Sequence, residues 1–313
     1  MRIQTLKIAN KLLPTPFFHR FKLERSLYCA SEHILPVYMG KLKIGLALWS
    51  LGVSPDIKTL EDQLKVAAEI GVKGVQLWCV DYDLKTPCVL DPDRCNSKLR
   101  YEIKELVKSY GLEISGFCAQ LSGPTRFGGL DEEDGLDKRI EKTKKALKLA
   151  ADMDAPIVTT HPGRIPKDRG SSIYTTIRRS VSEIAKYGEE VGAFFCIETG
   201  MEPADVLRSF LEDVGSVALK VNYDPANMLH FGVDEVVKGV KTLGEWIVHT
   251  HAKDHNPKTR RATVGEGLVP WDDYIAALRD IGYRGWFAIE DETGVDVVES
   301  IKRGKKFLEK YEI

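Results

Sequence analysis

Apolar positions along the chain gather into short runs, which longer amphipathic stretches separate. From about residue 41 onward one unit recurs: a helical stretch, a glycine, and then an apolar run with strand character. Glu69-Ile70-Gly71 precedes one such run, and a glycine there fits the left-handed end of a helix. The pattern predicts strands at about residues 42–49, 74–79, 113–120, 156–161, 194–198, 217–224, 246–251 and 285–290.

Helix start signals accompany these units. Thr59 and Asp62 are spaced as a capping box, and Ser97 is expected to open the next helix. Residues 271–273, Trp-Asp-Asp, place two acidic side chains in a first turn, where they complement the helix dipole. In the fourth unit Asp154-Ala155-Pro156 stands where the other units carry glycine.

Eight strands separated by helices over about 270 residues match the size and alternation of a parallel (β/α)8 barrel. The competing architecture is a doubly wound open sheet, which would be expected to carry a glycine-rich phosphate loop after its first strand. Residues 49–52, Trp-Ser-Leu-Gly, contain no such loop. The sequence therefore predicts a single α/β domain, a TIM barrel, over residues 41–313.

Residues 1–40 are expected to form an extension outside this barrel. Their six lysines and arginines face only Glu24 and Glu32. One interpretation is an organelle-targeting arm. The other is a segment upstream of a native start at Met39.

Composition narrows the class of protein. The 313 residues are 43% hydrophobic, and 45 basic residues nearly balance 46 acidic ones, so nothing indicates a nucleic-acid or membrane partner. No apolar run approaches the roughly 18 residues of a membrane helix. The six cysteines include no C-x-x-C pair, which favours a reducing, cytoplasmic setting.

Polar side chains end four consecutive predicted strands. Glu198, Asp224, His251 and Glu290 fall at the carboxyl ends of strands five to eight, the face on which barrel enzymes build their sites. Burying an unpaired carboxylate costs several kcal/mol, on the order estimated for isolated ions, and a divalent cation would offset that cost. Three carboxylates and one imidazole suit Mn²⁺ or Mg²⁺ better than a closed structural zinc site. His249 shares a strand face with His251 and is expected to lie deeper in the barrel.

The chain resembles the sugar phosphate isomerase/epimerase family of xylose isomerase-like barrels, which includes ketose 3-epimerases, hydroxypyruvate isomerase and inosose dehydratase. The resemblance covers roughly residues 41–313 and is most specific in the second half. It implies that the four strand-end residues are ligands of one divalent ion, most often Mn²⁺, with Mg²⁺, Co²⁺ or Zn²⁺ as alternatives. The matching pieces are Ile197-Glu198, Asp224-Pro225-Ala226-Asn227, residues 249–254 (His-Thr-His-Ala-Lys-Asp), Gly265-Glu266-Gly267 with Trp271, and residues 282–285 leading to Glu290.

Such a site suits chemistry beside a carbonyl group. A divalent ion held by neighbouring sugar oxygens stabilises an enediolate, while Glu198 and Glu290 act as the acid/base pair. Returning the proton to the opposite face gives an epimerase, and returning it to the next carbon gives an isomerase. Expelling a β-hydroxyl instead gives an inosose-type dehydratase, the main alternative. The expected substrate is a small sugar, sugar phosphate or polyol.

Two further alternatives fit the fold less well. Family members that cut DNA at abasic sites need extra His and Glu ligands on strands two to four, where this chain offers Gln76, Gln120 and His161. The chain is also nearly neutral, so it has no excess of basic residues to bind DNA phosphates. A non-catalytic sugar-binding barrel is disfavoured because the ligand quartet is complete.

Five residues are candidates for substrate contact. Asn227 lies where relatives place a substrate-contacting His or Asn, and its other interpretation is a turn residue. His161 ends the fourth strand, and Trp49 is a candidate for the pocket wall. Lys253 and Arg261 would suit a substrate phosphate or carboxylate, although Arg261 also fits a solvated basic loop. Relatives commonly form homodimers or homotetramers.

Overall fold

The computed structural model describes residues 41–80, 87–121 and 128–312, so the expected extension over residues 1–40 lies outside the described residues. Eight parallel strands close into a barrel in sequence order, with β8 paired to β1. This confirms the predicted (β/α)8 architecture. The strands are β1 (Lys43–Ala47), β2 (Gly74–Trp78), β3 (Glu113–Cys118), β4 (Ile157–Thr160), β5 (Phe194–Glu198), β6 (Leu219–Tyr223), β7 (Ile247–Ala252) and β8 (Trp286–Ile289).

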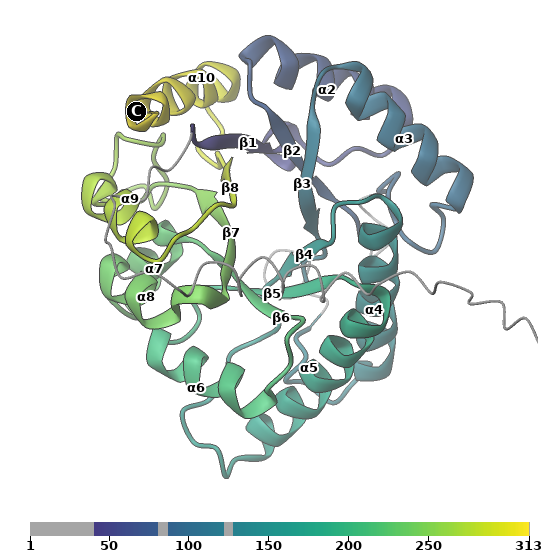
Figure 1. Ribbon diagram of the computed structural model, residues 1–313, viewed down its shortest axis with the longest axis vertical. Coiled ribbons are helices and arrows are strands. Elements are labelled where there is room, and N and C mark those ends of the chain that lie inside the picture. Colours follow the sequence, from purple (N-terminus) through teal and green to yellow (C-terminus); the bar gives the residue numbers. More distant parts are fainter. Residues whose placement is uncertain (1–40, 81–86, 122–127, 313) are drawn as a thin grey trace, which may run out of the picture. The chain divides into compact units, whose positions relative to one another are not determined.

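Helices surround the ring of strands (Figure 1). Two of them, α7 and α8, lie between β6 and β7, and short 3-10 turns follow β1, precede β7 and end the chain. The helices are α2 (Ile57–Ile70), α3 (Ser97–Ser109), α4 (Leu136–Asp152), α5 (Ser172–Val191), α6 (Ala204–Val214), α7 (Pro225–Phe231), α8 (Val236–Leu243), α9 (Trp271–Asp280) and α10 (Val297–Leu308); the 3-10 turns are η1 (Leu48–Leu51), η2 (Gly244–Trp246) and η3 (Glu309–Tyr311).

Packing between helices and strands builds most of the core. On α2 the buried residues Leu60, Leu64 and Ala67 recur at helical spacing and belong to the same apolar cluster as the strands. Strand β5 is buried at every position, as parallel strands covered on both faces are. Each fully buried leucine contributes roughly 1.5–3 kcal/mol, so the packing of helices on strands stabilises the barrel.

The predicted glycine ends are confirmed for several helices. Gly71, Gly192 and Gly215 adopt left-handed conformations directly after α2, α5 and α6. In the fourth unit Asp154 takes the left-handed position itself, with φ of 57°. Aspartate tolerates this conformation better than most residues, so the chain turns into β4 without a glycine.

The predicted capping box at Thr59 is wrong. Helix α2 begins two residues earlier at Ile57, and Asp56 caps it by accepting a hydrogen bond from the Thr59 N–H at 2.8 Å. Asn96 likewise caps α3 through the Leu99 N–H, so Ser97 is the first helical residue. In both cases the residue directly before the first helical residue supplies the side-chain oxygen that accepts an open N–H group.

Two remaining expectations concern the cysteines and the membrane. Cys79, Cys88, Cys95, Cys118 and Cys196 are buried and free, so none of the described cysteines forms a disulfide. Among the described residues, no helix has the length and apolar character that crossing a bilayer requires.

Candidate metal centre

Four buried side chains meet at the carboxyl ends of adjacent strands. Glu198 ends β5, Asp224 follows β6, His251 lies in β7, and Glu290 follows β8. Each offers one ligand atom, and these atoms all lie within 4.8 Å of one another. Strand order brings them together, since the carboxyl ends of parallel strands share one rim of the barrel.

The imidazole of His251 faces all three carboxylates. Its Nδ1 lies 3.3 Å from Glu198 Oε1, 3.3 Å from Glu290 Oε2 and 3.8 Å from Asp224 Oδ2. Burial opposes protonation, but Glu198 and Glu290 outweigh it and hold the pKa of His251 well above its usual value. A positive charge among these three buried carboxylates is therefore strongly stabilised.

The hydrogen bond at the opposite ring nitrogen of His251 determines which nitrogen is available to a cation. Its Nε2 lies 2.9 Å from Gln76 Oε1, while the amide nitrogen of Gln76 donates to the Thr159 hydroxyl. With its nitrogen committed as a donor, Gln76 presents its oxygen as an acceptor, so His251 Nε2 carries a proton. The Nδ1 lone pair is then available to a cation among the carboxylates.

Asp224 supplies a second sign that the group fits a metal ion. Its Oδ1 caps α7 by accepting the Asn227 N–H at 2.9 Å. Its Oδ2 is buried and accepts no hydrogen bond from the residues that the structure describes. An unsatisfied buried carboxylate oxygen is costly, and metal coordination would satisfy it. The donor set therefore fits one divalent cation.

Further hydrogen bonds orient the two glutamates. The Trp49 indole donates to Glu290 Oε1 at 2.9 Å, and Asn227 donates to Glu198 Oε1 at 3.1 Å. His161 Nε2 lies 3.4 Å from the same Glu198 oxygen. Three residues predicted to touch substrate thus reach the rim of the centre, where each contacts a carboxylate.

A polar layer lies beneath the centre; it contains His249, which the sequence places deeper than His251, and Asn222, which sequence reasoning missed. Asn222 accepts from His249 Nδ1 at 2.8 Å, and its amide nitrogen is 3.3 Å from the ring of His251. Burial, helped by His251, lowers the pKa of His249 to about 3, so this ring is neutral. Asn222 pairs with Glu198 in the register of β5 and β6. A polar residue two positions before Asp224 on a buried strand was the sequence signal that could have identified it.

Lys253 and Arg261, which were predicted to bind an anionic group of the substrate, form ion pairs with carboxylates of the protein. Lys253 Nζ lies 2.8 Å from Glu290 Oε2 and 2.7 Å from Glu292 Oε2. Arg261 Nε lies 2.7 Å from the same Glu292 oxygen. Sequence reasoning did not single out Glu292, which follows Glu290 in the loop after β8.

The loop that carries Arg261 is fastened to one aspartate. Asp254 is fully buried, and its Oδ2 accepts from the Gly265 N–H at 2.9 Å, the Gly267 N–H at 3.1 Å and the Trp271 indole at 2.8 Å. Its Oδ1 accepts two more backbone N–H groups. The motif residues 265–267 and Trp271 therefore serve to shape this loop.

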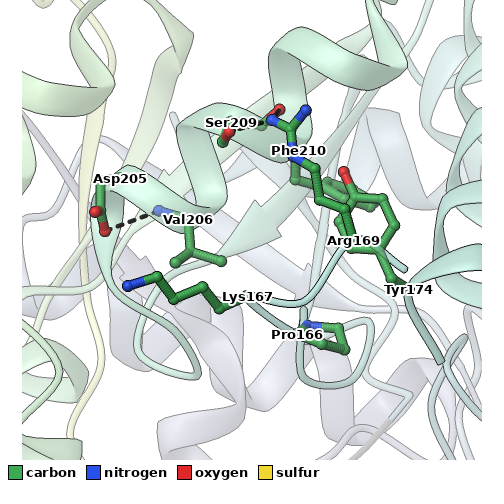
Figure 2. Close-up of a pocket in the computed structure, with 8 residues that line it drawn as sticks. All are labelled: Pro166, Lys167, Arg169, Tyr174, Asp205, Val206, Ser209 and Phe210. Atoms are coloured by element: carbon green, nitrogen blue, oxygen red, sulfur yellow. Dashed lines mark hydrogen bonds between the residues drawn. The ribbon is translucent and has the colours of Figure 1, made fainter. Parts of the chain in front are cut away.

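A separate surface pocket lies between the loop after β4 and helix α6 (Figure 2). Its cavity volume is about 200 Å³, and at its wall the Arg169 guanidinium donates to Ser209. None of its lining residues belongs to the candidate metal-binding group, Glu198, Asp224, His251 and Glu290, or to the residues described around it. The lining residues are Pro166, Lys167, Arg169, Tyr174, Asp205, Val206, Ser209 and Phe210.

Residues 64–311 match the family described as xylose isomerase-like TIM barrel, and the chain belongs to that family. It is 28% identical over 183 residues to an uncharacterized protein from Methanocaldococcus jannaschii, covering 54% of this chain and 62% of that protein. It is 31% identical over 122 residues to a D-psicose 3-epimerase from Ruminiclostridium cellulolyticum, covering 36% of this chain and 39% of that protein. Both alignments span less than two thirds of these curated relatives.

Solved structures share the fold. A xylose isomerase domain protein from Planctomyces limnophilus superposes with a TM-score of 0.72 at 22% identity, covering 86% of this chain and 96% of that one. The probable 3-DHS dehydratase AsbF from Bacillus anthracis superposes with a TM-score of 0.64 at 20% identity, covering 85% and 98%. At these identities the likeness concerns the fold alone.

Proposed function

We propose that this protein is a divalent-metal-dependent isomerase or epimerase of a small sugar or polyol. The observation that carries the proposal is the buried group of three carboxylates and one imidazole at the catalytic rim of a TIM barrel. The similarity of the chain to D-psicose 3-epimerases supports the reaction class. Glu198, Asp224, His251 and Glu290 would hold the ion, and Mn²⁺ is the cation that this oxygen-rich set favours.

When bound, the ion supplies Lewis-acid stabilisation of negative charge on the substrate carbonyl oxygen. Glu198 and Glu290 are then the acid/base pair. One takes a proton from the carbon beside the carbonyl, and the other returns a proton to that carbon or to its neighbour. Glu198 ends β5 and Glu290 follows β8, on either side of β6 and β7, so the two carboxylates would approach a bound substrate from different directions.

The neighbouring hydrogen bonds tune the two glutamates for these roles. Trp49 and Lys253 both donate to Glu290, one to each carboxylate oxygen, which fixes its rotamer. Asn227 donates to Glu198 from the first turn of α7. We assign Asn227, His161 and Trp49 to the inner part of the substrate site and Lys253 and Arg261 to its outer part.

Solvent exchange tests the reaction class. The purified chain, loaded with Mn²⁺ in D₂O, is incubated with free ketohexoses and followed by proton and deuterium NMR. We expect deuterium at the carbon beside the carbonyl together with a new epimer or isomer. Glu198→Gln and Glu290→Gln should each lower the rate by about 10²–10⁴-fold, the range for loss of a general acid or base.

The same experiment separates the dehydratase alternative. That reaction begins with the same proton removal, but the product has lost water and shows the absorbance of an unsaturated carbonyl compound. Exchange without water loss supports the isomerase or epimerase. A chain that binds metal but exchanges no proton into any ketose or polyol ketone overturns the proposed function.

A further inference from the structure

The outer wall of the candidate site contains an ion-pair cluster of three residues. Lys253 follows β7 and Arg261 lies further along the same loop, while Glu292 comes from the loop after β8. One oxygen, Glu292 Oε2, lies 2.7 Å from Lys253 Nζ and 2.7 Å from Arg261 Nε. Glu292 therefore pairs with both cations, and Lys253 also holds Glu290 Oε2 at 2.8 Å.

Burial makes this arrangement matter for binding. The Lys253 side chain is 7% exposed and lies beside the metal-binding group, 3.7 Å from Asp224 Oδ2. Arg261 and Glu292 are each 35% exposed, so the cluster extends from the buried Lys253 to groups that solvent reaches. A ligand that approaches from the open side meets the Glu292 carboxylate together with the two cations.

The charges of these connected groups balance once the ion is bound. Glu292 and the three ligand carboxylates carry four negative charges, and Lys253, Arg261 and one divalent cation carry four positive charges. A neutral sugar leaves this balance intact. A phosphorylated or carboxylated substrate adds negative charge against the Glu292 carboxylate, at a separation where the effective dielectric is far below that of water.

We propose that Glu292 is a charge-selecting residue that restricts the site to uncharged sugars. By pairing with Lys253 and Arg261 it removes the anion site that these two cations would otherwise form, leaving their N–H groups to contact hydroxyl oxygens. This inference rests on the proposed function for its substrate class and for the bound ion. It assigns to Glu292 a role in specificity rather than in proton transfer.

Sulfate titration by calorimetry tests the proposal without relying on turnover. We compare the Mn²⁺-loaded wild type with Glu292→Gln, which keeps the side-chain shape and removes the charge. Glu212→Gln is the matched control, because Glu212 forms an exposed pair with Arg208 on α6. We expect sulfate to bind Glu292→Gln at least about tenfold more tightly than wild type, while the control stays unchanged.

The double variant Glu292→Gln/Arg261→Met identifies the source of the gain. If the released guanidinium binds the anion, sulfate affinity returns towards the wild-type value. Thermal unfolding of each variant verifies that it is folded, and both partners are exposed enough to tolerate replacement. Equal sulfate affinity in folded Glu292→Gln and wild type overturns the proposal.

Binding of a neutral and a phosphorylated sugar distinguishes failure of this inference from failure of the proposed function. Binding of D-fructose should change less than about threefold in Glu292→Gln, whereas D-fructose 6-phosphate should gain about tenfold or more. Ketose binding and exchange with no charge preference would overturn the role of Glu292 and leave the proposed function standing. A sulfate gain in a chain that exchanges no ketose proton would keep the charge selector and overturn the proposed function.

Discussion

Replacing Asp254 by asparagine tests whether one buried carboxylate organises the loop that borders the site. Asp254 is fully buried, and its two oxygens accept five hydrogen bonds. Asparagine has nearly the same shape but presents an NH₂ group in place of one oxygen. Whichever way the amide turns, that group faces N–H donors.

The magnitude follows from the less costly orientation of the amide. If the remaining oxygen keeps the Gly265, Gly267 and Trp271 donors, the NH₂ group opposes the backbone N–H groups of His255 and Val269. Each hydrogen bond to a buried charge contributes about 1.5–3 kcal/mol. Two lost bonds therefore predict that the free energy of unfolding falls by about 3–6 kcal/mol, a large part of the stability of a typical domain.

Urea unfolding of metal-free protein, followed by far-ultraviolet circular dichroism, measures this change. The control is Asp205→Asn, since Asp205 is exposed and accepts only the Val206 N–H among the described hydrogen bonds. The control should lose less than about 1 kcal/mol, as surface substitutions do. An Asp254→Asn protein within about 1 kcal/mol of wild type would refute the view that this carboxylate fastens the loop.

Three further predictions follow from single contacts. Burial raises the pKa of Glu202 to about 7, so the folded state binds an extra proton between the ordinary carboxyl range and that value, and stability falls as pH rises through this window. Glu202→Gln should remove this loss of stability: in urea titrations the free energy of unfolding should rise by up to about 3 kcal/mol at pH 8 and change little at pH 4. A pH profile of stability unchanged from wild type would contradict this. Gly74→Ala should cost about 1–3 kcal/mol in urea titrations, because the added methyl group would lie 2.7 Å from the Trp286 ring; a neutral effect would mean that the ring moves freely. Trp49→Phe should weaken Mn²⁺ binding about tenfold in calorimetry by removing the hydrogen bond to Glu290, and undiminished affinity would show that this bond does not position the ligand.

The barrel was predictable because its signals are local and repeat eight times. A helical stretch, a left-handed turn and a short apolar run each follow from neighbouring residues, and the strand boundaries differ by only a few positions. Helix starts were harder, since Asp56 and Thr59 both offer a capping oxygen within one turn. The choice between them depends on how α2 packs, which the pattern does not encode.

The meeting of the four strand-end side chains was predictable for a related reason. Strand order alone places the ends of β5 to β8 side by side, so Glu198 and Glu290 had to share a rim. The contact between Gln76 and His251 joins residues 175 positions apart and depends on barrel closure and on two rotamers. Glu292 escaped notice because its partners come from a different loop, whose path Asp254 determines.

Metal titration tests whether Glu198, Asp224, His251 and Glu290 together hold one divalent ion. Chelator-treated wild type, Asp224→Asn and the control Glu212→Gln are titrated with Mn²⁺ by calorimetry, and bound metal is counted by mass spectrometry. We expect about one ion per chain in wild type and control, and a loss of at least about tenfold in affinity for Asp224→Asn, because Oδ2 of Asp224 accepts no hydrogen bond from the described residues. Absence of saturable binding in wild type, or equal binding by Asp224→Asn, would contradict this.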